Sequence, residues 1–144
     1  MTDSFFSMSV KCVPVPKLRS RSIKSGRHYT PAKTANFESM IKAQAKLMMG
    51  FKGPTSEPVE LVVGFYFPVS KSWTNAKKRS AINGEVAQKP DVTNLVKSVE
   101  DALNGVVYVD DCQIVRIVAE KHFVDAGCEG VDIVVNFSNR QFDR

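Results

Sequence analysis

Four stretches of the chain are rich in apolar residues with a period of two or with apolar residues on both faces, and they predict four β-strands. The stretches are 6–12, 59–69, 113–123 and 131–137. The second stretch is apolar on both faces, which is typical of a strand in the middle of a sheet or covered by a partner. The last two stretches are separated by a turn at 126–130, so we expect them to pair as a hairpin.

Apolar residues recur at helical spacing in two other stretches. The first helix is predicted to begin at Thr30-Pro31, because the hydroxyl can cap a helix and proline suits its first position. It is expected to end at Gly50. The second helix is predicted to follow Pro90 and to end at Asn104-Gly105. Its apolar stripe consists of Leu95, Val96, Val99, Ala102 and Leu103.

A short third helix is expected between 70 and 88, capped by Ser72 or Thr74. The resulting order, β-α-β-(α)-α-β-β, predicts an α+β fold in which helices pack on a mixed β-sheet. The 144 residues suit a single domain over 1–144, with a polar tail from about Ser138.

Two compositional features indicate where the protein works. No apolar run approaches the roughly 18 residues that span a membrane, and the N-terminus lacks a secretory signal pattern. We therefore predict a cytoplasmic protein without a membrane partner. The cysteines have no metal-binding spacing and are expected to be reduced, mostly buried thiols; they are Cys12, Cys112 and Cys128.

Negative charge is concentrated in one region of a basic chain. The net charge is +5, yet five carboxylates occur between 89 and 113, namely Asp91, Glu100, Asp101, Asp110 and Asp111. Such a group favours a divalent metal ion held against a polyanion. Each acid also has a plainer interpretation. Asp91 suits a helix N-cap, Asp101 suits a surface pair with Lys97, and Asp110-Asp111 suits a solvated turn.

Clustered carboxylates that hold Mg²⁺ would suit phosphodiester hydrolysis, which needs an activated water and stabilisation of charge on the phosphate. Asn94, Lys97 and Asp101 share one face of the predicted helix, whereas Glu100 lies about 100° away and is expected on the surface. The predicted metal ligands are Asp91 and Asp111, completed by Asp110 or Asp101. Lys97 is predicted to stabilise the scissile phosphate, and Asn94 to orient a ligand or a phosphate.

Two basic segments are candidates for phosphate contact. No acid occurs between Asp3 and Glu38, although the loop that follows the first predicted strand is rich in bases. In this basic loop the predicted DNA-binding residues are Lys17, Arg19, Arg21, Lys24 and Arg27. The second segment carries Lys77, Lys78 and Arg79. A solvated loop and a surface helix attached to the core by Trp73 are the plainer alternatives.

Two long motifs resemble a known family. KPDVTNLVK followed by EDALNGVVYVDDCQIV resembles the signature of the RusA-type Holliday junction resolvases, and VPVPKLRSRS…GRHYTP is similar to that family's opening. The resemblance covers about Val13 to Lys121. It implies a homodimeric endodeoxyribonuclease of bacteria and phages. The implied cofactor is Mg²⁺, which Mn²⁺ can replace. The implied activity is the resolution of four-way DNA junctions by paired symmetric nicks in recombination and repair.

The resemblance implies that the family has essential acids at the positions of Asp91, Thr93 and Asp111, and a lysine at the position of Lys97. Thr93 is a departure, because some members have aspartate there. We expect Asp101 to compensate, unless Thr93 is simply a helix cap. The alternative is a non-catalytic DNA-binding module with a degenerate metal site. The implied dimer interface is expected at apolar surfaces around Phe65, Phe67 and the helix segment 40–49.

Overall fold

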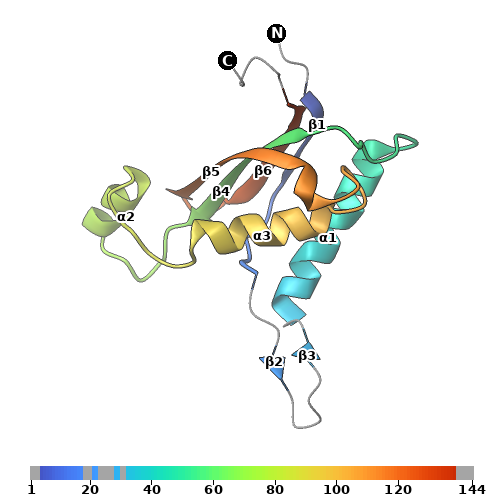
Figure 1. Ribbon diagram of the computed structural model, residues 1–144. Coiled ribbons are helices and arrows are strands. Elements are labelled where there is room, and N and C mark those ends of the chain that lie inside the picture. The colour runs from blue at the N-terminus through green and yellow to red at the C-terminus, as the bar shows by residue number, and fades with distance from the viewer. Residues whose placement is uncertain (1–3, 18–20, 23–27, 30–31, 139–144) are drawn as a thin grey trace.

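Figure 1 shows the computed structural model, which describes residues 4–17, 21–22, 28–29 and 32–138. The elements are β1 (Ser4–Val10), β2 (Arg21–Ser22), β3 (His28–Tyr29), α1 (Ala32–Met49), β4 (Val59–Pro68), α2 (Asn75–Ile82), α3 (Val92–Leu103), the 3₁₀ turn η1 (Asp111–Gln113), β5 (Ile114–Val124) and β6 (Gly130–Phe137). Apart from the small β2–β3 pair, this is the predicted order.

The main sheet has four strands in the order β1-β6-β4-β5. β4 pairs in parallel with β5 and antiparallel with β6, and β6 pairs antiparallel with β1. The predicted mixed sheet and α+β fold are confirmed. The prediction that 59–69 forms a central strand is also confirmed, because β4 has a neighbour on each side.

The predicted hairpin of the last two strands is wrong. β5 and β6 are not neighbours, because β4 lies between them. Two strand spacings are about 10 Å, and a link of about five residues can span that distance when extended. The segment 125–129 therefore crosses over the end of β4, so the short turn does not require adjacent strands.

Helices α1 and α3 cover one face of the sheet (Figure 1). The residues of β4 that point to this face are almost completely buried, and they are Val59, Leu61, Val63 and Phe65. Phe65 is therefore part of the core, which corrects its assignment to a dimer interface. Phe67 is only partly buried and packs against the core. On α1, Met49 is buried, whereas Met48 is exposed.

The segment between β1 and the basic loop is attached to both helices by buried hydroxyl groups. Ser98 Oγ of α3 donates to the carbonyl of Val15 at 2.8 Å, and Thr34 Oγ1 of α1 donates to the carbonyl of Pro16 at 3.0 Å. The backbone N–H of Lys17 donates to the carbonyl of Asn94 at 2.8 Å. These bonds fix where the chain leaves the core and enters the basic loop.

Two other expectations are addressed by the structure. Cys12 is half-buried, but Cys112 and Cys128 are exposed, so the prediction of mostly buried thiols is wrong for these two. All three are free thiols, as predicted. Within the described ranges, no helix is both long enough and apolar enough to cross a membrane.

Replacing Ser98 by alanine should destabilise the fold. The Val15 carbonyl would lose its hydroxyl partner in a part-buried position, which costs on the order of 1–3 kcal/mol. Urea denaturation should show this loss in the free energy of unfolding. Ser39→Ala, on the exposed side of α1, is the matched control and should change it by less than about 0.5 kcal/mol. Equal effects of the two substitutions would contradict this role of Ser98.

Candidate active site

Helix α3 has one apolar and one charged side. Its buried side includes Leu95, Val99 and Leu103, all with no exposed surface. Asn94 and Lys97 are exposed on the other side, so the helix presents its polar residues away from the sheet. The helix ends as predicted, because Asn104 is its C-cap and Gly105 adopts a left-handed φ of 79°.

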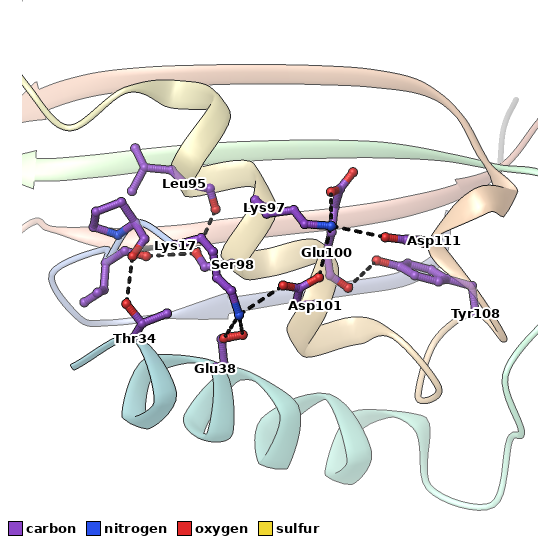
Figure 2. A network of polar contacts seen from close by, with 12 residues as sticks. Lys17, Thr34, Glu38, Leu95, Lys97, Ser98, Glu100, Asp101, Tyr108 and Asp111 are labelled. Atoms are coloured by element: carbon purple, nitrogen blue, oxygen red, sulfur yellow. Dashed lines mark hydrogen bonds and ion pairs between the residues drawn. The ribbon is translucent and has the colours of Figure 1, made fainter. Parts of the chain in front are cut away.

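Three carboxylates surround the ammonium group of Lys97. Its Nζ lies 3.3 Å from Asp101 Oδ1, 3.4 Å from Asp111 Oδ2 and 3.9 Å from Glu100 Oε2. Figure 2 shows that Asp111 approaches from outside α3, whereas the other two acids belong to the helix. Glu100 was expected on the surface, but its side chain is only 16% exposed. The structure therefore brings Glu100 into the site.

Lys17 holds the other oxygen of Asp101. Its Nζ lies 3.1 Å from Asp101 Oδ2 and 2.9 Å from Glu38 Oε1. Asp101 is consequently bonded to two different lysines, one through each oxygen (Figure 2). Lys17 was predicted to contact DNA. The structure places its side chain between α1 and α3, where it links two acids.

The turn that carries Asp111 is fixed by Gln113. The side-chain nitrogen of Gln113 donates to the carbonyls of Thr55 and Glu57, both at 2.8 Å. Its side-chain oxygen accepts the backbone N–H of Asp110 at 2.8 Å. One side chain thus attaches the Asp110-Asp111 turn to the loop before β4. Nearby, the hydroxyl of the fully buried Tyr108 donates to the carbonyl of Glu100.

The local charges shift several pKa values. Burial lowers the pKa of Lys97, but the attraction of Asp101 and the hydrogen bonds to Asp101 and Asp111 outweigh it, so the pKa is raised overall. The pKa of Lys17 is raised in the same way by Glu38 and Asp101. Burial raises the pKa of Glu100, against the opposing effect of Lys97. Both lysines therefore carry a full positive charge at neutral pH.

Asp91 and Asp110 lie at the margins of this cluster. Asp91 is the exposed N-cap of α3, without a side-chain cap hydrogen bond. At 1.5 Å per residue, it lies about 9 Å along the helix axis from Lys97. Asp110 is exposed, and a hydrogen bond from the Cys112 thiol lowers its pKa. Thr93 is exposed in the first turn of α3.

The predicted DNA-binding residues fall into two groups. Arg21 belongs to β2, whereas Arg19, Lys24 and Arg27 lie outside the described residues. In α2, Thr74 is the N-cap, as predicted, and its hydroxyl accepts the N–H of Lys77 at 3.2 Å. The basic side chains of this helix are largely at the surface; they are Lys77, Lys78 and Arg79.

Trp73 attaches α2 to the sheet. Its ring meets Phe123 of β5 edge-on, with the ring centres 5.6 Å apart. The ammonium group of Lys77 in α2 lies 4.3 Å from the centre of the Trp73 ring, which precedes the helix. Trp73 is thus half-buried and has the packing role that the plainer interpretation predicts.

The donors around Lys97 suit magnesium, but they do not form a closed cage. In the part of the chain that the structure describes, no three Asp, Glu, His or Cys side chains converge closely enough to hold a metal ion. Mg²⁺ commonly takes only one or two carboxylates and completes its shell with waters and substrate phosphates. The all-oxygen donors at Asp111 and its neighbours therefore fit an open site that a phosphate would complete.

Three residues of this site were missed by the sequence analysis. Glu38 was noted only as the end of the acid-free stretch, although an isolated acid there indicates a partner among the surrounding bases. Gln113 was read only as a strand residue, and Tyr108 was not considered. Their roles depend on contacts across 8 to 58 positions of the chain, which periodicity cannot reveal.

Replacing Gln113 by leucine should loosen the Asp110-Asp111 turn. The change removes the bonds to Thr55, Glu57 and Asp110 and should lower the free energy of unfolding by about 1–2 kcal/mol. Amide hydrogen exchange should also become faster at Asp110. Gln44→Leu, at an exposed position of α1, is the control. Unchanged exchange at Asp110 would show that Gln113 does not hold the turn.

Comparisons with known proteins identify the family of this chain. The family model of endodeoxyribonuclease RusA matches residues 11–136. The chain is also 36% identical over 120 residues to a Bacillus subtilis (strain 168) protein named uncharacterized protein YqaN, covering 76% of this chain and 82% of that protein. The matched family span includes α3, η1 and β5, and so every residue around Lys97. The chain therefore belongs to the RusA family of endodeoxyribonucleases.

Proposed function

We propose that this chain resolves four-way DNA junctions by paired symmetric nicks, in a Mg²⁺-dependent reaction of DNA recombination and repair. The arrangement around Lys97 carries the proposal, because one ammonium group lies between carboxylates of α3 and of the turn before β5. In a chain of net charge +5, such a local group of acids suits a cation held against a polyanion. Membership of the RusA family supports the substrate class.

Each residue of the cluster has a proposed role. Asp111 is the main metal ligand, and Asp91 and Asp110 contribute directly or through water. Bound Mg²⁺ supplies an activated water at neutral pH and stabilises charge on the phosphate oxygens; Mn²⁺ is expected to replace it. Lys97 exchanges a carboxylate for the scissile phosphate and stabilises its developing charge. Its raised pKa keeps it protonated for this step.

Asp101 is proposed to orient Lys97. Both of its oxygens face ammonium groups, at 3.1 Å and 3.3 Å, which leaves little capacity for a metal ion. The sequence suggested a different role, in which Asp101 supplies the negative charge that Thr93 lacks. The first role acts on the rate of the chemical step, whereas the second acts on metal affinity, so the two are separable.

DNA is proposed to cross α3 between two basic segments. The β2–β3 pair and α2 lie at different ends of the helical layer (Figure 1). Asn94, exposed in the first turns of α3, is proposed to contact a phosphate. The proposed phosphate-binding residues of the two segments are Arg19, Arg21, Lys24, Arg27, Lys77, Lys78 and Arg79. Lys17 serves this group indirectly, by anchoring the start of the first segment.

The active form is proposed to be a homodimer. A four-way junction has approximate two-fold symmetry, and its resolution requires two opposed nicks. Two identical active sites related by a two-fold axis satisfy this requirement, because a closed dimer presents the same site twice. A single copy could cut only one strand at a time.

Asp111→Asn should abolish junction cleavage. The change removes the carboxylate between Lys97 and the proposed metal, and the rate should fall by about 100-fold or more. A labelled four-way junction and a linear duplex, each with Mg²⁺ or EDTA, would measure it. Asp125→Asn, in the exposed turn after β5, should cleave normally. Junction binding without nicks by the unmodified chain, under every metal condition, would instead favour a non-catalytic DNA-binding module.

Asp101→Asn should separate the two roles of that residue. If Asp101 orients Lys97, kcat falls and the Mg²⁺ concentration for half-maximal rate changes by less than about twofold. Lys97→Met should then give the same pattern, because both substitutions remove the correctly placed ammonium group. If Asp101 is a ligand, the half-maximal Mg²⁺ concentration should rise by about tenfold or more. That rise would overturn the orienting role.

A further inference from the structure

The segment between α2 and α3 leads the chain into Asp91 and lies mostly at the surface. It spans residues 83–90 and contains no helix or strand. Its first residues bond back to the end of α2 through their backbone N–H groups. Among the described residues, the hydrogen bonds that reach the backbone of 86–90 come from one side chain, that of Lys121. Lys121 is therefore the polar attachment of the entrance to α3.

Lys121 lies on the face of β5 that the helices cover. It pairs in register with Phe65 of β4, which has no exposed surface, whereas the residues on either side of Lys121 are exposed. Its Nζ donates to the carbonyl of Pro90 at 2.8 Å and also to the carbonyl of Gln88. The ion pairs of the described residues include none with Lys121. Two of the three N–H donors of this ammonium group are thus used on backbone carbonyls.

The bond to Pro90 acts on Asp91 through one rigid peptide group. A peptide group is planar, so the carbonyl oxygen of Pro90 and the Cα atom of Asp91 lie in one plane. An ammonium group that holds this oxygen therefore fixes the direction in which the chain enters Asp91. Asp91 in turn starts the helix, because its own carbonyl accepts the N–H of Leu95 at 3.2 Å.

The carboxylate of Asp91 is not used to stabilise the helix. Asp91 has the backbone of an N-cap, with φ −70° and ψ 139°, but its exposed side chain makes no cap hydrogen bond. An N-cap aspartate normally accepts an N–H of the first helical turn. A base near this end is also unfavourable for a helix, because the N-terminus carries partial positive charge. Helix stability therefore explains neither the free carboxylate nor the lysine beside it.

We propose that Lys121 is a positioning residue that holds Asp91 in place for the metal site. This inference rests on the proposed function, in which Asp91 contributes to the binding of Mg²⁺. Asp111 is joined to the start of β5 through η1, and Lys121 attaches the backbone before Asp91 to the same strand. One strand thus carries one acid through the chain and holds the other through a side chain. Removal of a residue that orients a metal ligand commonly costs about 10–100-fold in metal affinity.

The experiment measures Mn²⁺ binding to the full chain without DNA, by electron paramagnetic resonance of the free ion. Lys121→Met keeps the apolar body of the side chain but removes its donors, and should raise the dissociation constant for Mn²⁺ by about tenfold or more. Lys121→Gln shortens the side chain and removes its charge, and should have the same effect if Lys121→Met does not fold. Lys71→Met, at an exposed lysine in the turn before α2, is the matched control and should bind Mn²⁺ normally.

A double variant tests whether Lys121 acts through Asp91. Asp91→Asn alone should weaken Mn²⁺ binding, and the addition of Lys121→Met should weaken it no further, because the positioned carboxylate is already absent. Amide hydrogen exchange at Leu95 should also become faster in Lys121→Met, because the carbonyl that accepts its N–H is no longer held. Independent losses that multiply in the double variant, or weaker DNA binding at unchanged Mn²⁺ affinity, would overturn the positioning role.

Failure of this proposal is distinguishable from failure of the proposed function. If Asp111→Asn loses Mn²⁺ binding while Lys121→Met keeps it, the metal site stands and the positioning role is overturned. If Asp111→Asn and Asp91→Asn both bind Mn²⁺ as the unmodified chain does, the proposed metal site is wrong, and the role of Lys121 is overturned with it. Weaker Mn²⁺ binding in all three variants supports both proposals.

Discussion

The geometry of the active site depends on the sharing of Asp101 between two lysines. Lys17 takes one carboxylate oxygen at 3.1 Å and Lys97 takes the other at 3.3 Å. At such distances a pair of unit charges attracts by about 5 kcal/mol at an effective dielectric constant near 20, before solvent screening at the half-exposed Lys97 and the cost of removing the charges from water reduce it. Without Lys17, Asp101 and Glu38 would be left as part-buried carboxylates with one ammonium group fewer. The position of Lys97 is therefore determined by a contact with the segment that precedes the basic loop.

Carboxylates outnumber ammonium groups among the ion pairs of Lys17 and Lys97, and this excess of negative charge suits the binding of a cation. Among the ion pairs of the described residues, Glu38, Glu100, Asp101 and Asp111 share only Lys17 and Lys97. Burial raises the pKa of Glu100, which means that the ionised form of this one side chain is held at some energetic cost. A divalent cation would relieve this cost, and a phosphate would in turn satisfy Lys97. The charges of this cluster thus suit both the proposed metal ion and the proposed phosphate.

Local patterns predicted much of this fold, and the remainder depended on contacts between distant residues. The stripe from Leu95 to Leu103 and the stop at Gly105 identified α3, because both are properties of one helix. The placement of β4 between β5 and β6 follows from pairing along the whole strand, which a five-residue turn does not encode. Glu100 was wrongly predicted to lie on the surface, because helical geometry gives the angle between side chains of one helix but not the approach of Asp111 from outside it. The hydrogen bonds of Gln113 could not be predicted either, because they join residues far apart in the sequence.

The candidate site and strand β5 are consecutive along the chain, and this has a structural consequence. Asp111 lies three residues before Ile114, where β5 begins. Gln113, between them, bonds to the loop before β4, so the position of Asp111 is set by the sheet and not by a long connection. Lys97 belongs to α3, which covers the same sheet (Figure 1). The 3.4 Å contact between Lys97 and Asp111 therefore depends on how α3 packs on the strands.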